Sequence, residues 1–221
     1  MKLNFEKVKK GTKTFLQDAF VFPFYILLHP IKGFEEFKYE KKGKLYIAFF
    51  YLFMMILSSV MVETMSGFLI RPAWAETFNL GRTALLVIVP VFLVAIGNWS
   101  ITTLFDGKGS VKEIFMVVMY GLIPYIWISI PMTLISNFLI RDEVQFYFAL
   151  ISIGGFLAGY KIFMGLLVIH EYTLLKTILT VISTIIAVAI IIFIGLLLLT
   201  IFQQVYAFIK AIYDELILRM R

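Results

Sequence analysis

The sequence predicts an all-α integral membrane protein, a five-span helical bundle with interfacial helices near both termini. Apolar residues make up 61% of the 221 residues and charged residues only 15%, a composition whose apolar surface a soluble domain could not bury. The apolar residues gather into runs of the length that an α-helix needs to cross a hydrocarbon core, about 20 residues. The five runs are 45–62, 84–105, 114–140, 146–170 and 178–202.

Residues 1–44 form a basic arm with ten lysines and five acidic residues. Lysines before a first span retain that end in the cytoplasm and attract anionic lipid head groups. The apolar stretch 15–29 contains Pro23 and is too short to cross, so it predicts an interfacial helix, with a re-entrant path as the alternative. The direct succession of basic and apolar stretches favours a membrane surface over nucleic acid. Four lysines are expected to strengthen this attachment: Lys7, Lys9, Lys10 and Lys13.

The five runs are expected to form one membrane domain, 45–202, between the basic arm and a C-terminal segment. In 203–221 apolar residues recur at helical spacing opposite polar ones, which predicts an amphipathic helix along the outer interface. Five spans from a cytoplasmic N-terminus place the C-terminus outside, and we expect the bacterial plasma membrane as the location. The sequence has no cysteine, which excludes disulfides and thiolate metal sites.

The third run is too long for one straight span. Ser110 and Glu113 have the spacing of a capping box, which would start a helix before the apolar region. Pro124 lacks the amide hydrogen that a continuous helix needs, and Gly121 lowers the cost of a bend. We therefore predict a helix break at Gly121 and Pro124 and an exposed cytoplasmic platform before it. The loop of this platform is the candidate partner-facing surface: Asp106, Gly107, Lys108, Gly109, Ser110 and Lys112.

Two polar stripes form a candidate seam inside the membrane. Lys161, in the fourth run, shares a helical stripe with small residues, so it is expected to point inward. Asn98 and Thr102 form a comparable stripe in the second run, at a depth similar to that of Lys161. We expect the second and fourth spans to pack together with Asn98 facing Lys161. The pair predicts either a transport or gating site or a packing contact, and small-residue stripes favour packing.

Other motifs do not support catalysis or cofactor binding. His170 and Glu171 begin a zinc-protease pattern, but Leu174 stands where the second histidine would be. In the 106–110 loop, Lys108 is followed by glycine instead of the serine or threonine of a phosphate-binding loop. We predict no cofactor, no metal site and no catalytic residues.

Three short motifs occur in order along the chain. They are His29-Pro30 with Lys32, Gly33 and Phe34; Asn98-Trp99 leading to the Gly-rich turn at 104–110; and Tyr120-Gly121-Leu122-Ile123-Pro124. Together they resemble the Yip domain family, the Ypt/Rab-interacting membrane proteins and their bacterial relatives, over about 29–202. The resemblance implies a five-span bundle with a cytoplasmic N-terminus and no known catalytic chemistry. The acidic-Leu-x-Gly-Pro element of the eukaryotic members is not evident, so the resemblance does not extend to binding of small GTPases.

These observations favour a non-enzymatic multi-pass membrane scaffold or accessory protein. Its expected partners are anionic lipid at the basic arm and another membrane protein or assembly, such as a transporter. The alternative is a small transporter, channel or lipid-translocating protein that uses the polar seam between the second and fourth spans. A membrane enzyme is a distant third hypothesis.

Overall fold

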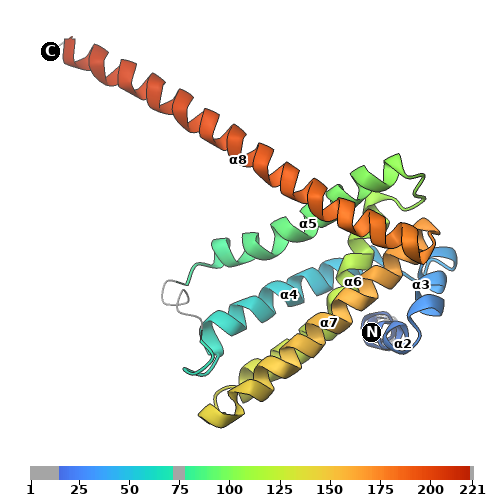
Figure 1. The fold of residues 1–221 in the computed structure, drawn as a ribbon. Coiled ribbons are helices and arrows are strands. Elements are labelled where there is room, and N and C mark those ends of the chain that lie inside the picture. The colour runs from blue at the N-terminus through green and yellow to red at the C-terminus, as the bar shows by residue number, and fades with distance from the viewer. Residues whose placement is uncertain (1–14, 72–77, 220–221) are drawn as a thin grey trace, which may run out of the picture.

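The computed structural model describes residues 15–71 and 78–219, which fold into helices joined by short loops (Figure 1). Within these residues five helices are long and apolar enough to cross a membrane, as the sequence predicts. They are α4 (Leu45–Met65), α5 (Leu80–Leu104), α6 (Val111–Ile135), α7 (Val144–His170) and α8 (Leu174–Arg219). The shorter elements are η1 (Gln17–Val21), α2 (Phe22–Leu28), α3 (Pro30–Tyr39) and η3 (Arg141–Glu143).

Helix α6 lies at the centre of the bundle and packs against α4, α5 and α7. In its most apolar stretch 67% of the residues of α6 are buried inside the protein, whereas none are buried in the most apolar stretch of α8. Helix α8 packs mainly against α5 and then extends away from the other helices (Figure 1). The bundle is therefore built around α6, with α8 as its least enclosed helix.

The predicted break in the third span is wrong, because α6 is one continuous helix with Pro124 inside it. A Cβ atom on Gly121 would lie 2.4 Å from Cγ1 of Ile162 and 3.1 Å from its backbone nitrogen. Gly121 therefore lets α6 and α7 approach closely, so it serves close packing between the two helices and does not end α6. The capping box of Ser110 and Glu113 does start the helix, as predicted.

The C-terminal segment is helical, but it is not a separate element. Residues 203–219 continue α8 without interruption, so the 46-residue helix combines the fifth span and the expected amphipathic helix. At 1.5 Å per residue α8 is about 69 Å long, more than twice the roughly 30 Å of a hydrocarbon core. The fifth span and the C-terminal segment form one helix instead of two because residues 203–221 contain no proline or glycine that would end the helix after the span.

The N-terminal apolar segment packs at the end of the bundle where α4 begins. Phe20 and Phe24 stack on Trp127 of α6, and the Tyr51 hydroxyl of α4 donates a hydrogen bond to the Ala19 carbonyl. Tyr51 is six residues into α4, about 9 Å along its axis. The N-terminal apolar segment therefore packs only near the end of the bundle where α4 begins. We call this the N-terminal end of the bundle. The lysines predicted to strengthen membrane attachment, Lys7, Lys9, Lys10 and Lys13, lie outside the described residues.

Candidate functional site

A cluster of polar contacts at the N-terminal end joins four helices and one loop. It connects α3, the end of α5, the α5–α6 loop, the end of α7 and the first half of α8. We call this cluster the polar junction, and its members are Lys38, Tyr39, Asn98, Lys108, Gly109, His170, Glu171 and Thr184.

The buried half of the polar junction is centred on His170. The side-chain nitrogen of Asn98 donates a hydrogen bond to the Thr184 hydroxyl at 3.0 Å, so its oxygen is left to accept. Nε2 of His170 lies 3.1 Å from that oxygen and therefore donates to it. Nδ1 of His170 accepts a hydrogen bond from the Gly109 amide at 3.2 Å. These partners assign the neutral imidazole with its proton on Nε2.

The loop before α6 is docked on the His170 side chain. A Cβ atom on Gly109 would lie 2.7 Å from Cε1 of His170, and one on Gly107 would lie 2.6 Å from both Nδ1 of His170 and the Tyr172 hydroxyl. The Tyr172 hydroxyl also donates a hydrogen bond to the Phe105 carbonyl at 2.9 Å. Only glycine fits at the two loop positions without displacing these rings.

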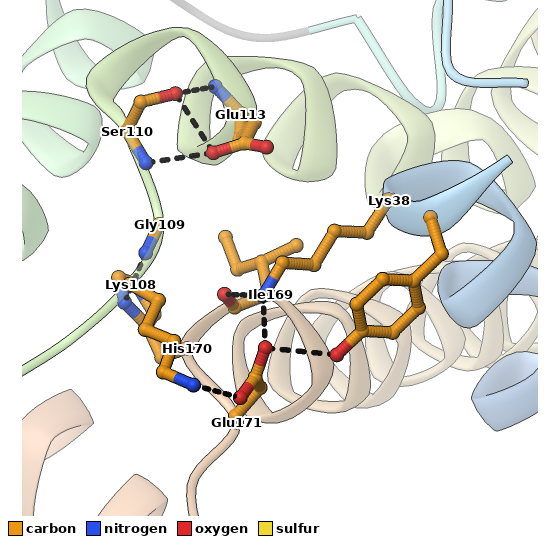
Figure 2. A network of polar contacts seen from close by, with 9 residues as sticks. Lys38, Lys108, Gly109, Ser110, Glu113, Ile169, His170 and Glu171 are labelled. Atoms are coloured by element: carbon orange, nitrogen blue, oxygen red, sulfur yellow. Dashed lines mark hydrogen bonds and ion pairs between the residues drawn. The ribbon is translucent and has the colours of Figure 1, made fainter. Parts of the chain in front are cut away.

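The exposed half of the polar junction is centred on Glu171. Figure 2 shows Lys38 reaching both the Ile169 carbonyl, at 2.9 Å, and the Glu171 carboxylate, at 2.8 Å. Lys108 approaches the same carboxylate from the loop, and the Tyr39 hydroxyl donates a hydrogen bond to it at 2.8 Å. Lys38 therefore also satisfies a terminal carbonyl of α7, which has no partner within the helix.

These contacts shift the ionisation of Glu171 and its partner. The hydrogen bond from Lys108, followed by those from Lys38 and Tyr39, lowers the pKa of Glu171 to about 2. The same contact with Glu171 raises the pKa of Lys108. Both groups are therefore charged at neutral pH, and the loop is held to α7 by an ion pair.

The predicted polar seam is only partly present. Asn98, Thr102 and Lys161 are all buried, which confirms that they point inward. Asn98 contacts His170 and Thr184, however, so the predicted pairing of Asn98 with Lys161 is wrong.

The reason lies in the way α5 packs. A Cβ atom on Gly97 would lie 2.7 Å from Cγ2 of Val188, so glycine lets α8 approach this side of α5 closely. The adjacent Asn98 then meets α8 and the end of α7. Lys161 of α7 is also buried, and its Nζ atom has no hydrogen-bond partner in the described part of the chain.

The candidate partner-facing loop divides into two sets of residues. The side chains of Asp106, Lys108, Ser110 and Lys112 are exposed. Gly107 and Gly109 instead lie against His170 and Tyr172.

Sequence reasoning missed the central residues of the polar junction. The sequence predicts a role for His170 and Glu171 only through an incomplete protease motif, and it predicts no role for Lys38 or Thr184. Polar residues that directly follow an apolar run, at the same end as the Gly-rich turn, are the signal that could have found His170 and Glu171.

The arrangement is suited to holding helices together. The donors and acceptors around His170 satisfy one another, and the acidic group on the surface is neutralised by two lysines. Across residues 15–71 and 78–219, no three His, Cys, Asp or Glu side chains are grouped as metal ligands. The polar junction is therefore a structural tether that positions the loop and the base of α8.

Comparison with known proteins identifies the family. The family model for the Yip1 domain matches residues 24–201, which include every member of the polar junction. No curated protein and no solved structure matches the chain. Because the match covers most of a chain that folds into five membrane-spanning helices, this protein belongs to the Yip1 domain family.

Proposed function

We propose that this chain is a non-enzymatic membrane accessory protein that binds another integral membrane protein through the projecting part of α8. The observation that carries this proposal is the exposure of α8 beyond the bundle. From 196 to 217 every described side chain of α8 is exposed. Many of these are large apolar side chains, including Leu197, Phe202 and Tyr206.

Lipid alone does not account for a helix of this length. The part of α8 that packs on α5, up to about Val188, already contains roughly 15 residues, and about 30 more extend beyond it, or some 45 Å of helix. Spanning helices associate by close packing and by hydrogen bonds in the membrane, and an apolar helix without neighbours is available for such packing. A partner with its own spanning helices would cover the projecting part of α8.

The polar junction supports this role because it holds the base of α8 in place. Thr184 of α8 accepts a hydrogen bond from Asn98, and α8 begins three residues after Glu171. The direction of the projecting part is therefore set by contacts within the bundle.

We place the N-terminal end of the bundle in the cytoplasm of a bacterial cell, since ten lysines and five acidic residues precede the first span. The C-terminus then lies outside. The exposed residues of the α5–α6 loop would form a second, cytoplasmic contact with the same partner, and the basic arm would bind anionic head groups.

The transport alternative loses its predicted seam. Asn98 makes its hydrogen bonds to His170 and Thr184, and it is not paired with Lys161. We therefore do not propose transport through these residues.

Site-specific photo-crosslinking in native membranes tests the α8 surface with the full chain. A photoreactive residue replaces Phe193 or Phe202 of α8, and the matched control replaces Phe53 of α4. These three phenylalanines are similarly exposed, at 61%, 70% and 60%. We expect a discrete protein adduct from the two α8 positions and none from Phe53. The same lipid-only labelling at all three positions would contradict the proposal.

The loop contact is tested separately by Lys112→Glu. Lys112 is exposed and forms no ion pair with a residue that the structure describes, so its charge reversal should weaken partner recovery without disturbing the bundle. Lys108→Glu is less informative because it also breaks the ion pair with Glu171. Unchanged partner recovery with Lys112→Glu would remove the loop from the proposed interface.

A further inference from the structure

A cavity of about 520 Å³ lies between α4, α5 and α6, away from the polar junction. Its lining is mainly apolar, with Val87, Pro90 and Leu122 among the contributing residues. This volume is within the range of small-molecule sites, about 300–1,000 Å³. Leu86 lines the cavity and is 58% exposed, so the cavity opens sideways, toward the surface that faces lipid.

The cavity is elongated along the helices. Its lining on α5 extends from Thr83 to Val94, and its lining on α6 extends from Val118 to Ser129. Each pair is eleven residues apart, about 16 Å along a helix axis. A cavity of this shape, open to the bilayer and parallel to the spans, fits an extended hydrocarbon chain.

A carboxylate lies at one end of this apolar cavity. Glu63 lines the cavity, is only 5% exposed and accepts a hydrogen bond from the Thr83 hydroxyl at 2.9 Å through Oε1. It stands in the last turn of α4, and Thr83 stands in the first turn of α5. The carboxylate is therefore at the level where these helices end, which is the level of lipid head groups.

Within the described ranges, Glu63 forms no ion pair with a lysine, arginine or histidine. Its second oxygen, Oε2, accepts no hydrogen bond from a described residue. A buried carboxylate with one hydroxyl partner is costly unless a cation joins it. The cavity thus combines a site for a positive charge at its end with room for an apolar chain beside it.

We propose that this cavity binds one acyl chain of a phospholipid whose head group carries a primary ammonium, with the ammonium bound to Glu63. A primary ammonium has three N–H donors, so it can donate to Oε2 of Glu63. A quaternary ammonium has no N–H group and cannot form these hydrogen bonds. The acyl chain lies between α5 and α6, and the phosphate remains outside the cavity, beyond the ends of α4 and α5.

Competitive lipid retention tests the proposal. The full chain is placed in nanodiscs with equal amounts of phosphatidylethanolamine and phosphatidylcholine that carry the same acyl chains. It is then released into mild detergent, and the retained lipids are counted by native mass spectrometry. We expect phosphatidylethanolamine to be preferred by about tenfold, the ratio that corresponds to one hydrogen bond to a charged group. Equal retention of the two lipids by the wild type would overturn the proposal.

Two variants and one control assign the preference to the cavity. Glu63→Gln keeps the side-chain size and an acceptor for Thr83, and we expect it to abolish the preference while retaining the fold. Ser59→Phe fills the cavity that Ser59 lines, and we expect it to reduce retention of both lipids. The control Asp142→Asn removes an exposed carboxylate outside the cavity, and its retention should match the wild type.

Other outcomes also decide the proposal. A preference that persists in Glu63→Gln, or retention that is unchanged in Ser59→Phe, would overturn it. Equal retention of phosphatidylglycerol, whose head group has no cation, and of phosphatidylethanolamine would also overturn the proposal. The cavity would then bind acyl chains without recognising the head group. If Glu63→Gln does not fold, Ser59→Phe together with the lipid competition in the wild type still tests the site.

Discussion

The imidazole Nε2 of His170 lies 3.1 Å from the side-chain oxygen of Asn98, and this contact joins the end of α7 to α5. The side-chain nitrogen of Asn98 donates a hydrogen bond to the hydroxyl of Thr184 of α8, at 3.0 Å. One asparagine therefore links three membrane-spanning helices at a single depth. Because both side chains are almost fully buried, Nε2 of His170 depends on the Asn98 oxygen for its hydrogen bond.

Replacing Asn98 with leucine should destabilise the protein. The change leaves Nε2 of His170 without an acceptor, and an unsatisfied buried donor costs about 1–3 kcal/mol. The free energy of unfolding in detergent measures the effect. The control is Ser100→Ala on the same helix, whose exposed hydroxyl donates only to the Ile96 carbonyl. Equal stability of the two variants would contradict the role of Asn98.

Replacing Gly109 with alanine should displace the loop from His170. The new Cβ would lie 2.7 Å from Cε1 of the imidazole, and overpacking of this kind costs about 1–3 kcal/mol. Gly155→Ala is the matched control, since a Cβ there meets nothing within 4 Å. Thermal unfolding of both variants checks this expectation, and a loss of stability only in Gly155→Ala would reverse it.

Replacing Gly121 with alanine distinguishes a packing role from a hinge role. A Cβ at Gly121 would lie 3.1 Å from the backbone nitrogen of Ile162, so α6 and α7 would have to separate. We expect a loss of about 1–3 kcal/mol in the free energy of unfolding. If Gly121 were instead a flexible hinge in a broken helix, alanine would stabilise the helix by up to about 1 kcal/mol. The sign of the change therefore decides between the two roles.

Replacing Lys161 with methionine should leave stability unchanged or raise it. Nζ of Lys161 is buried with no hydrogen-bond partner among the described residues, so the variant removes an uncompensated polar group and keeps a stem of similar length. The midpoint of thermal unfolding in detergent is the measurement. A clear fall in this midpoint would mean that Nζ binds a group which stabilises the fold.

The Glu171 contacts should respond to acid. The pKa of Glu171 is lowered to about 2 in the folded protein, so its carboxylate stabilises the fold above its ordinary pKa, near 4.5. This contribution is lost as the pH falls from about 4.5 toward 2, because in this range Glu171 takes up a proton in the unfolded state and remains ionised in the folded state. The difference in unfolding midpoint between wild type and Glu171→Gln should be constant above pH 5 and shrink below it. A difference that grows on acidification would contradict this assignment.

The sequence by itself determined the class of this protein and the presence of five apolar helices long enough to cross a membrane. Local patterns in the sequence predict three features that the structure confirms. These are helices long enough to cross the hydrocarbon core, the capping box of Ser110 and Glu113, and the inward direction of Lys161. These features depend on residues close together in the chain, so they can be worked out without knowing which helices are neighbours.

Only the tertiary structure decided which helix each polar face meets. Gly97 admits α8 to one side of α5 and so gives Asn98 the partners Thr184 and His170. His170 lies nine residues, about 13 Å, beyond Lys161 along α7, so Asn98 and Lys161 do not meet at the similar depth that the sequence predicts. Gly121 likewise acts through Ile162, a residue on another helix, and not through the bend that its own helix could have formed. Periodicity is a local property, whereas the relative depth of two side chains and the neighbour of a helix face depend on how segments distant in the sequence pack together.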